Sequence, residues 1–110
     1  MGITKSEIFN EQQNKIALLA KAIGHPARVA ILQHLFRTNS CVCGDLVDEI
    51  GLAQPTISQH LKELKNLKII KGNIEGTSIC YCIDQETWSE IVELFQVFFG
   101  QKINKAGDCC

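Results

Sequence analysis

The sequence has no long apolar run, only two prolines and almost no net charge. A membrane-spanning helix needs about 20 consecutive apolar residues, and no stretch supplies them. Residues 1–10 lack the charged and then apolar layout of a signal peptide. We therefore expect a cytoplasmic protein with no membrane partner. The net charge of −1 carries no global sign of nucleic-acid binding, so any case for DNA must rest on local charge.

Internal repeats, low-complexity stretches and linkers rich in proline, glycine or serine are also lacking. A chain of 110 residues that is 45% hydrophobic and 21% charged is typical of one globular domain. We expect residues 1–100 to form this domain. Residues 101–110 are predicted to be a flexible polar tail, because chain ends without apolar anchors are usually mobile.

Apolar periodicity and turn residues define the order of elements. They predict helices over residues 10–23, 26–36, 45–50, 54–67 and 86–99, and strands over residues 69–74 and 78–83. Gly51 forms the turn between the short helix and the longer one, and Gly76 lies at the tip of a hairpin. A short helix, a glycine turn, a longer helix and a hairpin are the layout of a winged helix-turn-helix. The predicted fold class is mainly α with a small β-hairpin wing.

The helix predicted over residues 54–67 has one apolar stripe and a polar outer face. Hydroxyl and amide groups near its start and lysines further along suit contacts to bases and phosphates in a major groove. From residue 54 to residue 71 four lysines stand against one acid, a net charge of +3. A solvated helix face without a ligand is the alternative, and the hairpin directly after the helix favours DNA. The predicted DNA contacts are Gln54, Pro55, Thr56, Ser58, Gln59, His60, Lys62, Lys65, Lys71 and Thr77.

His60 lies on the shoulder of the apolar stripe, so a histidine in the core and one that contacts phosphate are both open. No cofactor is required for DNA binding itself. The expected partner is double-stranded operator DNA.

Six cysteines form two Cys-x-Cys pairs and a final Cys-Cys pair. In a cytosolic chain such a number indicates metal binding or thiol redox chemistry rather than structural disulfides. Residues two apart on a strand share a face. We expect Val42, Tyr81 and Ile83 to face the core, which directs Cys41, Cys43, Cys80 and Cys82 outward. If the segment before the short helix pairs with the second hairpin strand, these four thiols lie on one face of one sheet.

Thiolates select soft metals and metalloids over hard cations. The predicted metal site consists of Cys41, Cys43, Cys80 and Cys82, with Cys109 and Cys110 as additional candidate ligands. As(III), Sb(III), Cd, Zn and Cu(I) are the candidate inducers. Arsenite needs only three thiolates, so one cysteine of the four would be spare.

Other functions of the cysteines and of the domain stay open. A disulfide within a Cys-x-Cys pair is strained, because extended residues two apart lie about 6.6 Å from each other, but a cross-strand bridge such as Cys41 to Cys82 is not. Redox sensing and cysteines without a sensory role are thus alternatives. A winged helix used only for protein contacts is another. A thiol enzyme needs a base beside its cysteine, and His25, His34 and His60 all lie in the helical half, so we do not expect an enzyme.

Three segments resemble the ArsR/SmtB family of winged-helix metalloregulators, and the likeness extends from about Ile16 to Phe99. Residues 22–32 are similar to the family's opening helices, residues 41–46 to the start of its short helix, and residues 54–64 to its recognition helix. The hairpin of residues 72–83 fits the wing. In members that sense arsenic the Cys-x-Cys pair directly precedes Asp-Leu, whereas Gly44 intervenes here and Val47 stands at the position of the third cysteine. The last predicted helix has no histidine, so the family's zinc site of Asp and His is not expected.

The resemblance implies a homodimer formed by the first and last helices. It also implies repression at an operator with an inverted repeat and release when metal binds, with arsenite as the first candidate. The last helix supports a dimer independently, because its apolar residues exceed the need of one small core: Trp88, Ile91, Leu94, Phe95, Phe98 and Phe99. Completion of the monomer core is the alternative for these residues.

Overall fold

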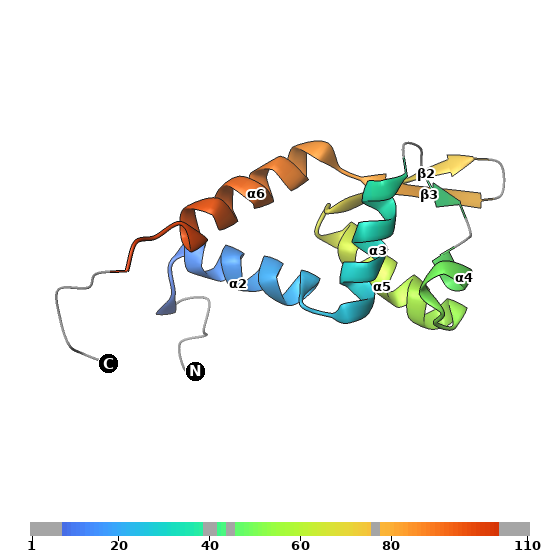
Figure 1. Cartoon of the computed structure of the whole chain (residues 1–110), viewed down its shortest axis with the longest axis horizontal. Helices are drawn as coiled ribbons and strands as arrows, with labels where there is room; N and C mark the ends of the chain where they lie inside the picture. The colour runs from blue at the N-terminus through green and yellow to red at the C-terminus, as the bar shows by residue number, and fades with distance from the viewer. Residues whose placement is uncertain (1–7, 39–41, 44–45, 76–77, 104–110) are drawn as a thin grey trace.

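The computed structural model describes residues 8–38, 42–43, 46–75 and 78–103 (Figure 1). Within these ranges the elements follow in the order α2 (Glu11–Ile23), α3 (Pro26–Arg37), β1 (Val42–Cys43), α4 (Leu46–Ile50), α5 (Gln54–Asn66), β2 (Ile70–Glu75), β3 (Ser78–Ile83) and α6 (Gln85–Phe99). The predicted class, mainly α with a β-hairpin wing, is confirmed. None of the helices in the described ranges is long and apolar enough to cross a membrane.

The helix starts are explained by local capping. Asn10 accepts a hydrogen bond from the Gln13 amide at 2.7 Å, and the Gln13 side chain accepts one from the Asn10 amide at 2.9 Å. This reciprocal pair satisfies two N–H groups that a helix start leaves unpaired, so Asn10 caps α2. His25 Nδ1 accepts from the Ala27 amide at 3.1 Å and caps α3, whose first residue is the predicted proline. Asp84 caps α6 by accepting from the Thr87 amide, which moves the start of α6 to Gln85.

Two residues with positive φ shape the helix-turn-helix and its exit. Gly51 has φ 82° in the turn between α4 and α5, a conformation that glycine adopts without strain. Lys68 has φ 62° after α5, and the Ile69 amide bonds back to the Leu64 carbonyl at 3.0 Å. This closure is typical of a helix C-terminus and holds Ile69 outside the sheet. The first hairpin strand therefore starts at Ile70, one residue later than predicted.

The three strands form one antiparallel sheet in the order β1-β3-β2. In the hairpin Ile70 pairs with Ile83 and Lys71 with Cys82. On the other edge of β3, Val42 pairs with Tyr81 and Cys43 with Cys80. The expected pairing of the segment before α4 with the second hairpin strand is confirmed.

The core lies where α3, α5 and the base of the hairpin meet. Ile31, Leu64 and Ile69 are fully buried there. Leu19 of α2, Leu46 of α4 and Ile91 of α6 join the same cluster. In Figure 1, α3, α4, α5 and the hairpin form one body, and α2 and α6 extend away from it. Ile91 is the only residue of α6 that is buried. Trp88, Leu94 and Phe95 are partly buried against the core cluster, whereas Phe98 and Phe99 are exposed.

Candidate nucleic-acid interface and thiol site

The outer face of α5 is polar and open to solvent. Its side chains at Gln54, Pro55, Thr56, Ser58, Gln59, Lys62 and Lys65 are exposed, as is Lys71 on β2. The opposite side of the helix is buried and carries Ile57, His60, Leu61 and Leu64. Thr77 lies outside the described residues. Apart from Thr77 and the buried His60, every predicted DNA contact is therefore exposed where a ligand can reach it.

Hydrogen bonds order two amides on this face. The Gln54 amide donates to the Ser58 hydroxyl at 3.0 Å, and the Gln59 amide donates to the Glu63 carboxylate at 3.1 Å. Both bonds are exposed, and each spans one helical turn. An exposed bond of this kind is exchanged at low cost, because water or a ligand can replace either partner. The two amides can thus turn to base edges when DNA binds.

His60 is buried and belongs to a polar cluster behind the outer face. The Arg28 Nε donates to His60 Nδ1 at 3.0 Å, and its Nη1 donates to the Ala22 carbonyl at 3.0 Å. The rings of His25 and His60 lie with centroids 4.5 Å apart. Arg28 thereby joins the end of α2 and the first turn of α3 to the middle of α5, so it fixes the position of the recognition helix.

Burial lowers the pKa of His60, and the neighbouring His25 and Arg28 lower it further. The reason is that each of these disfavours a second positive charge at the site. The neutral ring is also the form that accepts the Arg28 hydrogen bond at Nδ1. His60 therefore takes the core position that the sequence left open, and its contact with DNA stays a prediction.

Arg28 was not among the predicted site residues. Its bond to His60 crosses 32 positions of sequence, and nothing in the local pattern around residue 28 indicates it.

Cys80 is completely buried and disulfide-bonded. We expected its side chain to be directed outward. By strand alternation Cys80 does lie on the face opposite Tyr81, which packs against the core. It is nevertheless buried, and the expectation of an outward Cys80 is wrong. Alternation assigns a residue to one face of a sheet but not its depth below the surface, and Cys80 stands on the central strand and is bonded through its sulfur.

Cys82 is half-buried and carries a thiol. Cys80 is the disulfide-bonded cysteine, so the bond that Cys80 forms differs from the cross-strand example of Cys41 to Cys82. Cys41, Cys109 and Cys110 lie outside the described residues, as does the side chain of Cys43. Within the described part of the chain, no group of three metal-ligating side chains is gathered. The site of four thiols stays a prediction.

Comparisons with known proteins bear on the helix-turn-helix and on the whole fold. The profile described as bacterial regulatory protein, arsR family, matches residues 25–71, which span α3 to the start of β2. An uncharacterised HTH-type transcriptional regulator from Methanocaldococcus jannaschii is 42% identical over 85 residues, which cover 76% of this chain and 94% of that protein. A Staphylococcus aureus homolog of the cadmium resistance transcriptional regulatory protein CadC is 33% identical over 90 residues, 81% of this chain and 74% of that protein.

Among solved structures, reduced HlyU from Vibrio cholerae superposes with a TM-score of 0.61 at 26% identity. The superposition covers 83% of this chain and 96% of that chain. The similarity therefore includes the wing and the helices on both sides of it.

Proposed function

The chain belongs to the arsR family of bacterial regulatory proteins and is a winged-helix, DNA-binding transcriptional repressor, and we propose that thiols on β1 and β3 control its binding to DNA. It is a regulator, not an enzyme. The observation that carries the proposal is the buried, disulfide-bonded Cys80, which pairs in the sheet with Cys43.

We assign Cys43 as the partner of Cys80 in this disulfide. Residues directly opposite each other in an antiparallel pair have Cα atoms about 4.5–5.5 Å apart, within the range of about 4.4–6.8 Å that a disulfide spans. In the reaction the two thiols lose two protons and two electrons to an oxidant such as a hydroperoxide. The product is a covalent bond between β1 and the wing, and reduction by a thiol reverses it.

The position of β1 gives this bond an effect on DNA binding. β1 comes shortly before α4, and α4 is joined to α5 through the turn at Gly51. A bond from β1 to β3 therefore limits how the helix-turn-helix moves relative to the wing. We propose that the reduced protein binds its operator and that the disulfide weakens binding. Couplings of about 5- to 150-fold are typical of such control.

A homodimer completes the proposal. Phe99 is 74% exposed and Leu18 of α2 is 52% exposed. These residues and Val92, Phe98 and Val97 leave much apolar side-chain surface on the pair of helices that extends away from the core. Large exposed apolar patches mark interfaces between proteins. Two copies joined through α2 and α6 would place two α5 helices on an operator with an inverted repeat, whose half-sites lie about 34 Å apart.

A soft metal or metalloid is the second candidate for the inducer, and one observation favours it. Cys80 and Cys82 are two residues apart on β3, so strand alternation places them on the same face of the sheet. Cys43 is the residue of β1 that pairs with Cys80, and it therefore shares this face. Three thiols in their reduced form match the ligand number of As(III) or Sb(III). Cys41, Cys109 and Cys110 would be further ligands for Cd, Zn or Cu(I). The metal would take the place of the disulfide at the same strands.

Fluorescence anisotropy on duplex DNA from the region upstream of the gene tests the proposal. The protein is measured reduced, oxidised with hydrogen peroxide, and reduced with arsenite or cadmium added. We expect oxidation to raise the Kd about 5- to 150-fold and a reducing thiol to restore it. The variant Cys43→Ser should bind like the reduced protein under both conditions, and the double variant Cys109→Ser/Cys110→Ser should respond like the native chain.

The results separate the two candidates. An oxidant response that persists in both Cys43→Ser and Cys80→Ala would overturn the assigned disulfide. Release by arsenite or cadmium under reducing conditions, abolished by Cys43→Ser and by Cys82→Ser, would select the metal. Binding that ignores oxidants and metals alike would leave a repressor whose cysteines are not sensory.

A further inference from the structure

The polar cluster behind the recognition helix is not used by the function proposed above. Arg28 Nε donates to His60 Nδ1 of α5 at 3.0 Å, and Arg28 Nη1 donates to the Ala22 carbonyl at the end of α2, also at 3.0 Å. His25 caps α3 through its own Nδ1, and its ring centroid lies 4.5 Å from that of His60. One guanidinium at the first turn of α3 therefore connects three helices, and its hold on α5 is a single histidine side chain.

The bond between Arg28 and His60 requires a neutral imidazole ring. A guanidinium group donates through all its N–H groups, accepts no hydrogen bond and keeps its proton. A neutral imidazole offers one ring nitrogen as an acceptor, whereas the protonated ring has an N–H group at both nitrogens. Protonation of His60 therefore changes Nδ1 from an acceptor into a second donor that faces Arg28. The bond is then lost, and two positive charges are left in contact.

The charges that act on His60 come from the start of α3. Burial lowers the pKa of His60, and the neighbouring His25 and Arg28 lower it further. On α5 itself the lysines are exposed, and Glu63 accepts a hydrogen bond from Gln59. The other elements that pack against α5 have charged side chains that are exposed, where water and salt screen them: Glu11, Lys15 and Lys21 on α2, Asp48 and Glu49 on α4, and Lys71 on β2.

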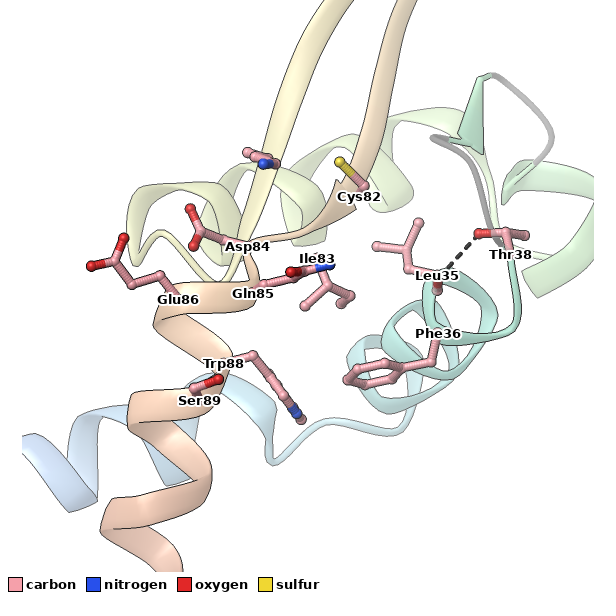
Figure 2. Close-up of a pocket in the computed structure, with 11 residues that line it drawn as sticks. Leu35, Phe36, Thr38, Cys82, Ile83, Asp84, Gln85, Glu86, Trp88 and Ser89 are labelled. Atoms are coloured by element: carbon pink, nitrogen blue, oxygen red, sulfur yellow. Dashed lines mark hydrogen bonds between the residues drawn. The ribbon is translucent and has the colours of Figure 1, made fainter.

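The other end of α3 is separate from this cluster. An open groove of about 800 Å³ lies there, between α3, the base of the hairpin and the start of α6, and Phe36, Cys82 and Trp88 line it (Figure 2). No residue of the cluster lines this groove. His34 and Arg37 are also in the last turn of α3. The helix has 12 residues, so its two ends are about 18 Å apart, which is longer than the screening length of about 8 Å in physiological salt.

The position of α5 matters more for base contacts than for phosphate contacts. Hydrogen bonds to base edges form at donor–acceptor distances of about 2.7–3.2 Å, and a binding site must hold its groups to within about 0.5 Å. Gln59, a predicted base contact, directly precedes His60 in the chain and is exposed on the outer face of α5. Flexible lysine side chains can follow a phosphate when the helix shifts. Loss of the Arg28 bond should therefore reduce specific binding first.

We infer that Arg28 is a positioning residue for operator recognition, and that protonation of His60 releases α5 and weakens specific binding to DNA in acid. The basis of this switch is DNA binding through α5, and the thiol control proposed above does not enter it. Acid also adds positive charge to the whole protein, which by itself strengthens binding to the polyanionic DNA. A loss of operator binding in acid is therefore opposite in sign to the general electrostatic effect.

Fluorescence anisotropy with rhodamine-labelled duplexes tests this from pH 7.5 to pH 5.0 at constant ionic strength. One duplex comes from the region upstream of the gene and the other has the same bases in scrambled order. The protein is kept reduced and without added metal, and the imidazole NMR signals of His60 record its protonation in the same buffers. One pH unit below the midpoint of His60 about one ring in ten is neutral, so the operator Kd should be about tenfold higher. The Kd for the scrambled duplex should stay constant or fall.

Four variants separate the positioning role from a general loss of structure. His60→Asn keeps an acceptor for Arg28 but does not titrate, so its operator Kd should not rise in acid. His25→Asn keeps a cap for α3 but removes the neighbouring ring, so the midpoint should move to higher pH in both NMR and binding. Arg28→Met should raise the operator Kd already at pH 7.5, with little further change in acid. Arg37→Met removes the same charge from an exposed position in the last turn of the same helix and should behave like the native chain.

Circular dichroism at each pH verifies that the chain is folded, and the two histidine variants carry the test if Arg28→Met does not fold. An operator Kd that is constant or falls in acid, a His60 signal that does not titrate above pH 5, or an acid response that persists in His60→Asn would each overturn the inference. Cys43→Ser should keep the acid response while it loses the response to oxidants, so failure of the thiol control and failure of this switch are distinguishable.

Discussion

Helices α5 and α6 are both amphipathic, but they leave opposite kinds of surface to solvent. α5 buries four residues and exposes amides, hydroxyls and lysines. α6 buries only Ile91 and exposes Val92, Phe98 and Phe99. The outer face of α5 suits a polar, negatively charged ligand, which is what DNA offers. The outer face of α6 suits another apolar surface. One small domain thus has two helices whose exposed faces suit two different kinds of partner.

The apolar surface of α6 is where the largest effect is expected. Phe99→Asp removes a phenylalanine from each copy in a dimer, and each burial contributes about 1.5–3 kcal/mol. Two copies give about 3–6 kcal/mol, which raises the dimer Kd at least a hundredfold. Sedimentation equilibrium should find monomers with a native circular dichroism spectrum. Glu93→Gln, on the side of α6 opposite Ile91, should remain dimeric, and a dimeric Phe99→Asp would refute the role of this face.

The buried side of α5 gives the next effect. Leu64 is fully buried, and Leu64→Ala should lower the free energy of unfolding by about 2–5 kcal/mol, since it leaves a cavity in the core. Lys65→Ala, the exposed neighbour, should change it by less than about 0.5 kcal/mol. Urea unfolding at one protein concentration measures both. Similar losses for the two variants would mean that the two sides of α5 are not as different as their exposure indicates.

The outer side of α5 should then affect specificity more than stability. Gln59→Ala is expected to cost about 1–3 kcal/mol of discrimination against the wrong base at one operator position. Lys62→Gln should weaken binding to all sequences about equally. It should also reduce the slope of the logarithm of the binding constant against the logarithm of the salt concentration by about 1. Anisotropy titrations at several salt concentrations distinguish the two. If Gln59→Ala weakened all sequences equally, Gln59 would contact the backbone of the DNA instead.

The smallest effect concerns the polar cluster behind α5. The folded state lowers the pKa of His60, so protonation favours the unfolded chain. The contribution of His60 to the free energy of unfolding is fully present above its pKa in the unfolded chain, about 6.5. It is lost as the pH falls through the lower pKa that His60 has in the folded protein. Thermal unfolding between pH 7.5 and pH 5 should record this decrease. His60→Asn keeps a hydrogen-bond acceptor for Arg28, but the asparagine side chain does not titrate between pH 5 and pH 7.5. This variant should therefore show a smaller decrease of the unfolding temperature over this pH range.

Much of the fold followed from local patterns. The periodicity of apolar residues, the turn at Gly51 and the proline at the start of α3 placed the helices and strands to within about one residue at most bounds. The misplaced bounds have local causes, such as the Asp84 cap and the αL residue Lys68. The exposed polar face of α5 was predictable for the same reason, because a helical period decides which side chains share a side.

The sequence by itself thus determined the order of the elements and which faces of the helices are apolar, since these depend on residues within a few positions of each other. The burial of Cys80, the bond between Arg28 and His60, and the groove around Cys82 were decided only by the tertiary structure. Each brings together segments far apart in sequence: β1 with β3, α3 with α5, and α3 with α6. A strand shows its alternation but not its depth in a sheet, and the neighbours that cover it come from elsewhere in the chain.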